Sequence, residues 1–189
     1  MSSAQSRRAL FLGSRSVGLI ANFIAFQCGW FACVLGAAYG WPLAGTATAG
    51  AIVVWHVLRA LRPAEELKLI MIALALGALW DSSLAAIGWI DFTSGTLVAG
   101  LAPPWILALW ALFATTLNAS LEWLKGSAPM AALLGAIAGP LSYWAGVRLG
   151  AIEFVAPLPA LVALAIGWGV MTPLLVAASR RYDGIHATH

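Results

Sequence analysis

The chain consists of long apolar segments separated by short polar stretches, and basic residues stand at alternate ends of those segments. A helix that crosses a bilayer needs about 20 mostly apolar residues, at a rise of about 1.5 Å per residue. Six segments meet this requirement without the alternation of apolar and polar residues that is typical of membrane-spanning strands. They are residues 17–40, 42–60, 68–90, 103–124, 128–149 and 157–178. The pattern therefore predicts one all-α domain over residues 1–189, a membrane bundle of about six transmembrane helices.

Composition supports this fold class. The chain is 62% hydrophobic and 9% charged, whereas a soluble domain carries roughly 25% charged residues. One apolar stretch, residues 92–102, is too short to cross a bilayer, and we expect it to be re-entrant or to lie at the membrane interface.

The distribution of basic residues predicts the orientation. Lysine and arginine are enriched in the cytoplasmic loops of membrane proteins. If both termini are cytoplasmic, nine of the ten basic residues face the cytoplasm and Arg148 alone faces outward, beside Asp91 and Glu153. The nine are Arg7, Arg8, Arg15, Arg59, Arg62, Lys68, Lys125, Arg180 and Arg181. We therefore interpret the basic charge as a signal of topology and of contact with anionic membrane lipids, and not of nucleic-acid binding.

Asp81 is the principal candidate for chemistry, because it lies deep inside the segment 68–90. A carboxylate near the bilayer centre costs roughly 2.5–3.5 kcal/mol on insertion scales, so it requires partners. Small residues at helical spacing, Gly77, Ala85 and Gly88, indicate that its face packs against other helices. Either Asp81 is an intramembrane acid or it forms a structural hydrogen bond between helices. Its candidate partners are Asn22, Gln27, Asn118, Ser142, Tyr143 and Arg148.

Weaker candidates lie on the other segments. Asn118, Ser142 and Tyr143 could orient a substrate beside Asp81. Glu122 continues a polar stripe with Thr115 and Asn118, but pairing with Lys125 at the membrane edge explains it equally well. His56 has the spacing of an interfacial histidine near Arg59, although proton transfer is conceivable.

We expect no metal and no cofactor. Cys28 and Cys33 lie on different sides of one predicted helix and outside any metal-binding spacing.

The segment 128–149 places small residues on one face, which predicts close helix packing at the centre of the bundle. These residues are Gly135, Gly139, Ser142, Gly146 and Gly150. A weak internal repeat is also visible, since GWIDF (88–92) is echoed by GAIEF (150–154) and the segments 42–60 and 103–124 both begin with proline beside tryptophan.

Two stretches carry a resemblance to a known family. PPWILALWALFATTLNASLEWL (103–124) and GAIAGPLSYWAGVRLGAIEF (135–154) resemble a bacterial family of small inner-membrane proteins classified as a domain of unknown function. The resemblance implies a compact multi-pass protein of the bacterial inner (cytoplasmic) membrane. It also implies lipid metabolism, because members of the family are often encoded beside fatty-acid-modifying enzymes.

A weaker similarity concerns WDSSLAAIGWIDF (80–92), which is similar to the Trp-Asp…Gly-x-Trp stretch of the lycopene cyclase domain. That similarity implies a helical fold acting on isoprenoids, with Asp81 as proton donor or electrostatic stabiliser. The Pro-x-Glu-Glu pattern of those cyclases is missing here, where the chain reads Pro103-Pro104-Trp105, so it does not imply carotenoid cyclisation.

Three functions remain compatible with the sequence. The protein could act on a fatty acyl or isoprenoid lipid with Asp81 as acid. It could be a non-catalytic membrane partner that docks lipid-modifying enzymes at its basic cytoplasmic face. It could be a small proton-coupled transporter, for which a homo-oligomer would compensate the small size. The sequence leaves open whether the protein is an enzyme.

Overall fold

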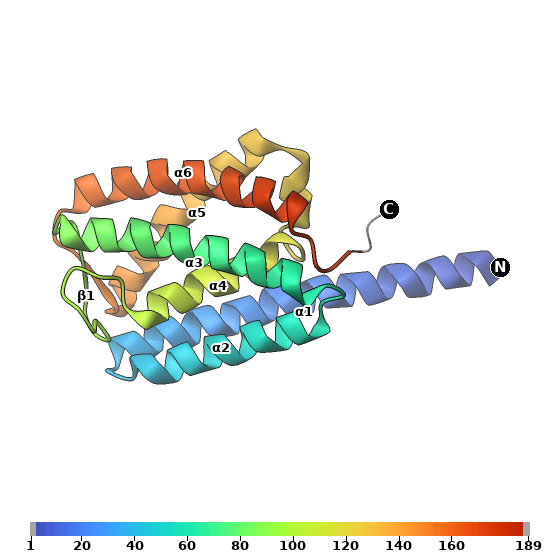
Figure 1. Cartoon of the computed structure of the whole chain (residues 1–189), viewed down its shortest axis with the longest axis horizontal. Coiled ribbons are helices and arrows are strands. Elements are labelled where there is room, and N and C mark those ends of the chain that lie inside the picture. Colours follow the sequence, from blue (N-terminus) through green and yellow to red (C-terminus); the bar gives the residue numbers. More distant parts are fainter. Residues whose placement is uncertain (1–2, 187–189) are drawn as a thin grey trace.

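The protein is an all-α bundle of six helices (Figure 1), and 76% of the chain is helical. The computed structural model describes residues 3–186, and side chains from Gly18 onward. The helices are α1 (Ser3–Ala38), α2 (Pro42–Arg59), α3 (Pro63–Ala86), α4 (Pro104–Leu117), α5 (Ala128–Leu149) and α6 (Pro157–Arg181). Two short strands, β1 (Ile90–Phe92) and β2 (Ile152–Phe154), and a 3₁₀ helix, η1 (Glu122–Gly126), complete the fold.

The predicted membrane bundle is confirmed, with a distinction among its helices. Within the described residues, four helical segments are long and apolar enough to cross a membrane: Gly18–Ala38 of α1, and α3, α5 and α6. Helix α4 is apolar but has only 14 residues, and α2 spans 18 residues that include threonine, glycine and histidine. Helix α4 lies between the other helices and buries most of its residues, whereas α2 lies at the edge of the bundle and buries only Gly45, Ala49 and His56 (Figure 1).

Prolines mark the helix starts. Proline occupies one of the first two positions of α2, α3, α4, α5 and α6, where its fixed φ suits a helix and its missing N–H costs no hydrogen bond. Three ends differ from prediction by five residues or more. Helix α1 starts at Ser3 instead of residue 17, and α3 starts at Pro63 instead of residue 68. Helix α4 ends at Leu117 instead of 124, because the chain turns at Asn118 before η1.

The bundle has two chemically different ends. At one end, which we call the basic end, the chain enters α1 and leaves α6 (Figure 1). The described basic residues there are Arg59, Arg62, Lys68, Lys125, Arg180 and Arg181. The side chains of Arg7, Arg8 and Arg15 lie outside the described residues. Arg148 lies at the opposite end, so the basic residues are separated as predicted, while the side of the membrane that each end faces stays a prediction.

The opposite end, the strand end, is closed by an antiparallel pair of strands. Asp91 lies opposite Glu153, flanked by Ile90 opposite Phe154 and Phe92 opposite Ile152. The strands are the two sequence echoes, IDF and IEF, and each follows a glycine with positive φ, Gly88 at 77° and Gly150 at 88°. A left-handed glycine ends a helix at low steric cost. The echoed segments therefore form the same helix–turn–strand unit twice and pair with each other.

Residues 93–103 form a loop at the strand end (Figure 1). The Ser94 hydroxyl donates to the carbonyl of Ala37 at 2.6 Å, and Trp105 Nε1 donates to the Ser94 carbonyl at 3.0 Å. The loop thus covers the ends of α1 and α4, and its depth in the membrane stays a prediction.

Candidate functional site

Asp81 is fully buried on α3 and accepts two hydrogen bonds from aromatic side chains. Trp110 Nε1 on α4 donates to Asp81 Oδ2 at 2.6 Å, and the Tyr143 hydroxyl on α5 donates to Asp81 Oδ1. Both donors are neutral, so the carboxyl group has hydrogen-bond partners and no cation directly beside it. Three helices are joined through this one side chain, which we call, with its two donors, the Asp81 cluster.

Two glycine–tryptophan contacts surround the cluster. A Cβ on Gly77 would overlap the Trp110 ring, and a Cβ on Gly139 would overlap the Trp168 ring, so both indoles lie directly on backbone. The indoles of Trp110 and Trp168 stack on each other, with centroids 4.5 Å apart and planes at 15°. This stack explains the small-residue face of α5, where Gly135, Gly139 and Gly146 are buried as predicted.

The same packing arrangement occurs twice, once in α3 with β1 and once in α5 with β2. Asp81 and Tyr143 are 62 residues apart, and Gly77 and Gly139 have the same separation, as do Ile90 and Ile152, the first residues of the two strands. Asp81 and Tyr143 therefore each lie one helical turn after a glycine, and the backbone of that glycine contacts a tryptophan of the following helix. The internal repeat weakly visible in the sequence corresponds to a repeated packing arrangement around Asp81 and Tyr143.

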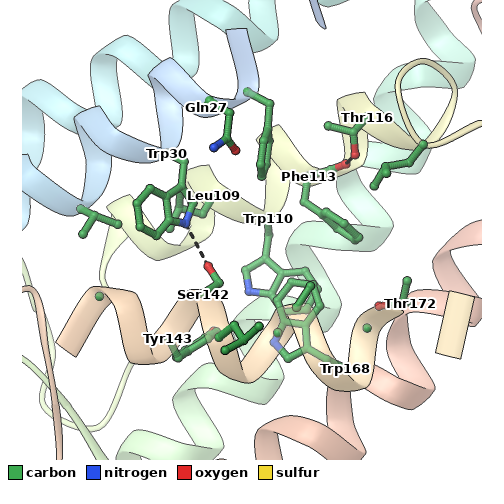
Figure 2. A pocket seen from close by; sticks show the side chains of 18 of the residues that line it. Gln27, Trp30, Leu109, Trp110, Phe113, Thr116, Ser142, Tyr143, Trp168 and Thr172 are labelled. Atoms are coloured by element: carbon green, nitrogen blue, oxygen red, sulfur yellow. Dashed lines mark hydrogen bonds between the residues drawn. The ribbon is translucent and has the colours of Figure 1, made fainter. Parts of the chain in front are cut away.

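An apolar cavity of about 490 Å³ borders the Asp81 cluster (Figure 2). It lies between α1, α4, α5 and α6, and its volume is within the range of roughly 300–1,000 Å³ that is common for small-molecule sites. Tyr143 and Trp110 form part of its wall, while Asp81 lies behind them and does not line it. On the α1 side, Trp30 Nε1 donates to the Ser142 hydroxyl at 2.9 Å, which links α1 to α5 across the cavity.

Three polar groups in the cavity wall have no normal hydrogen bond to a described residue. The Thr172 hydroxyl on α6 is buried, with the residue 2% exposed, and is unpaired. The Gln27 amide on α1 points into the cavity from the opposite side (Figure 2). Trp168 Nε1, also in the wall, approaches the Tyr143 hydroxyl without forming a hydrogen bond of normal geometry.

A second buried carboxylate, Glu66, was not a candidate from the sequence. It lies in the first turn of α3 with 0% exposure. His56 Nε2 lies 2.8 Å from Glu66 Oε2, and Glu66 Oε1 accepts from Asn118 Nδ2 at 2.6 Å and from the backbone N–H of Gly184 at 2.9 Å. We call these four residues the Glu66 cluster. His56 is therefore a buried partner of a carboxylate near the basic end of the bundle.

The Glu66 cluster holds residues 182–186, which we call the C-terminal segment, against the basic end. Arg62 donates to the carbonyls of Asp183 and His186, and Lys125 forms an ion pair with Asp183 at 2.8 Å. Partial burial raises the pKa of Asp183, but hydrogen bonds from Lys125 and from the backbone and side chain of His186 lower it to about 2. Lys125 of η1 and Arg62, the residue before α3, therefore both hold the C-terminal segment at Asp183, Lys125 through the carboxylate and Arg62 through the backbone carbonyl.

The remaining predicted residues are distributed between these clusters. Of the proposed partners of Asp81, Tyr143 contacts it, whereas Asn118 belongs to the Glu66 cluster and Ser142 bonds Trp30. Asn22 donates to the Thr115 carbonyl at 3.1 Å, and Arg148 lies over the ring of Trp144. Trp110, which sequence reasoning missed, is the second partner.

Glu122 does not continue the polar stripe of α4, because that helix has ended and Glu122 begins η1. Its carboxylate lies 3.4 Å from His186 Nε2, while Lys125 pairs with Asp183. Glu122 thus belongs to the ion pairs around the C-terminal segment and lies apart from the Asp81 cluster.

The fold and the site together define a multi-pass α-helical membrane protein with a buried polar cluster beside an apolar cavity. A family model described as "Protein of unknown function (DUF2878)" matches residues 19–174, and the chain belongs to this family. The resemblance seen in residues 103–124 and 135–154 is thereby confirmed. No curated protein and no solved structure matches the chain. The similarity to the lycopene cyclase domain is not shown by these comparisons.

Proposed function

We propose that this protein binds one fatty acyl or isoprenoid chain within the bilayer and acts on it, with Asp81 as an intramembrane acid. The observation that carries the proposal is the apolar cavity of about 490 Å³ with the Asp81 cluster in its wall. A cavity lined mainly by apolar and aromatic side chains, with a few placed polar groups, is the usual form of a site for an apolar ligand. Each methylene group buried there contributes about 0.8 kcal/mol relative to water.

In this proposal Tyr143 touches the lipid and Asp81 acts through it. The Tyr143 hydroxyl lies between the cavity and the Asp81 carboxyl group. In the acid form that this proposal requires, Asp81 is protonated on Oδ1 and donates to the phenol oxygen, while the Tyr143 hydroxyl turns toward the lipid. A proton moving from Tyr143 to the bound lipid is then replaced on the phenol oxygen by the proton of Asp81. Asp81 ends as the carboxylate, the state in which Tyr143 donates to it. Trp110 then stabilises that carboxylate through its hydrogen bond of 2.6 Å to Oδ2.

We also propose that the protein lies in the bacterial inner membrane with its basic end in the cytoplasm. Reporter fusions after Lys125 should give a cytoplasmic signal, and fusions near Ser94 and Glu153 a periplasmic one, in accordance with the positive-inside rule. A cytoplasmic signal at Ser94 would contradict the proposed orientation.

The test of chemistry compares variants in a strain that lacks the protein. Asp81→Asn keeps the shape and most of the hydrogen bonding but has no proton to deliver, and Tyr143→Phe removes the hydroxyl at the cavity wall. Both should fold, and both should fail to restore the lipid composition of the parent strain. Glu65→Gln, at an exposed ion pair with Lys68, is the matched control and should restore it fully.

Full restoration by Asp81→Asn would contradict the acid role. It would favour instead a non-catalytic membrane partner of lipid-modifying enzymes, and it would also exclude a transporter that cycles a proton on Asp81.

A further inference from the structure

The polar atoms that line the cavity indicate which kind of lipid it accepts. Among its described lining residues, none has a charged side chain. Asp81, the nearest acid, lies directly behind Tyr143 and Trp110. An anionic head group inside the cavity would therefore meet no basic partner, and an unpaired ion in apolar surroundings costs many kcal/mol.

Most strong donors of the wall are already in use. Trp110 Nε1 and the Tyr143 hydroxyl donate to Asp81, and Trp30 Nε1 donates to Ser142. Three described groups of the wall lack a normal hydrogen bond. They are the buried Thr172 hydroxyl, the Trp168 Nε1 group that approaches the Tyr143 hydroxyl, and the half-buried Gln27 amide. Buried polar groups in proteins are almost always paired, so an unpaired one that faces a cavity requires a partner from outside the protein.

The backbone around Thr172 holds that hydroxyl in the cavity wall. A Cβ on Gly135 would lie 2.8 Å from the Thr172 Cβ and closer still to its Oγ1, so glycine at this position lets α6 bring the threonine against α5. Figure 2 shows Thr172 beside Trp168 and Phe113, with Gln27 across the cavity on α1. The free hydroxyl on α6 and the free amide on α1 thus lie on opposite sides of the cavity, and the hydroxyl is the buried one.

We propose that the cavity selects an uncharged single-chain lipid whose one oxygen group is held by the Thr172 hydroxyl. A long-chain alcohol, aldehyde or ester has this chemistry, whereas a fatty carboxylate, a phosphate ester or a diphosphate does not. The proposal rests on the function proposed above and narrows it, because it names the head group while that function names only the chain.

The cavity contains its own reporters, since Trp30, Trp105, Trp110 and Trp168 line it. Bromine quenches indole fluorescence at short range, so lipids brominated in mid-chain report occupancy. The experiment titrates the purified full chain in detergent with four probes of one chain length: the bromoalkane, the alcohol, the carboxylate and the phosphate monoester. We expect the alcohol to bind at least tenfold more tightly than the carboxylate or the phosphate at neutral pH.

Variants identify the groups responsible. Thr172→Val preserves shape and removes the hydroxyl, and it should weaken binding of the alcohol about fivefold, as loss of one hydrogen bond does, while leaving the bromoalkane unchanged. Thr48→Val, on the exposed face of α2 where the hydroxyl bonds its own helix, is the matched control and should change neither. Gln27→Lys should increase the affinity for the phosphate and reverse the preference.

The outcomes separate the two proposals. If none of the four probes quenches, the lipid-binding function itself fails. If the alkane and the alcohol bind but the carboxylate and the phosphate bind equally well, or if Thr172→Val weakens alkane and alcohol alike, the chain site stands and the head-group assignment is overturned.

Discussion

Asp81 and Glu66 lie on the same helix, and both are completely buried, yet their surroundings differ in one respect. Every partner of Glu66 is supplied by packed protein: a histidine, an asparagine and a backbone N–H from the C-terminal segment. Asp81 has two aromatic donors, and on their far side lies an apolar cavity. A buried carboxylate surrounded by protein is explained by architecture, whereas one separated from a cavity by a single hydroxyl has the position that the proposed acid role requires.

The largest effect should come from Glu66→Leu. This change leaves His56, Asn118 and the Gly184 N–H without their acceptor, and each buried unsatisfied group costs about 1–3 kcal/mol. We expect almost complete loss of folded protein in detergent, measured by size-exclusion yield. Glu65→Leu is the control, because Glu65 forms an exposed pair with Lys68 and such pairs contribute about 0–1 kcal/mol. Equal yields for both variants would show that the Glu66 cluster is not structural.

Next in magnitude is Gly139→Leu, which affects the support of the Asp81 cluster. A side chain here would overlap the Trp168 side chain, because a Cβ added to residue 139 would lie only 2.6 Å from the Cβ of Trp168. Overpacking of this kind costs about 1–3 kcal/mol, and the thermal unfolding temperature should fall clearly. Leu133→Ala, on the exposed face of the same helix, should have little effect. A similar tolerance of both changes would mean that the stacked indoles can move apart freely.

A smaller change in stability should follow substitution of Asp81 itself. Asp81→Leu removes two interhelical hydrogen bonds, each worth about 0.6 kcal/mol on average inside a membrane, and Asp81→Asn should cost less because it retains one acceptor. Thermal unfolding of the two variants beside Glu66→Gln measures the comparison directly. If Asp81→Leu destabilised the protein as much as loss of Glu66, the contrast between a chemical and an architectural carboxylate would disappear.

The smallest expected effect is a loss of stability of the C-terminal segment at low pH. Because the pKa of Asp183 is lowered to about 2 from an ordinary value near 3.9, this group stabilises the folded state above that ordinary value. The contribution is lost as the pH falls through the interval between the two values. The protection factor of the Gly184 amide, which compares its exchange with that of an unfolded chain at the same pH, should fall over that interval in the parent protein. In Asp183→Asn the protection factor should be lower already at neutral pH and should change little over the same range.

Sequence patterns predicted the helices well because proline and apolar length mark them directly. Asp81 was recognised because it interrupts an apolar run, and Tyr143 was among its proposed partners. Trp110 was missed because a tryptophan in an apolar helix is normally interpreted as a packing residue, and only the structure shows its N–H donating to Asp81.

Glu66 was missed for a different reason. The predicted helix began at residue 68, which left Glu66 in a loop, where a carboxylate needs no buried partner. Pro63 followed by two acidic residues is a helix-start signal, and it would have placed Glu66 inside α3. Its contacts with Asn118 and Gly184 span 52 and 118 residues of sequence, and no local pattern reports contacts of that range.

The separation of 62 residues between Asp81 and Tyr143 has a consequence for the polarity of the bundle centre. Two identical halves would bring the same side chain to both sides of their meeting point, and two carboxyl groups there would compete for one proton. With aspartate on one side and tyrosine on the other, the contact pairs one donor with one acceptor. A backbone arrangement that repeats itself thus contains an asymmetric hydrogen bond, in which the phenol on α5 lines the cavity and the acid on α3 lies behind it.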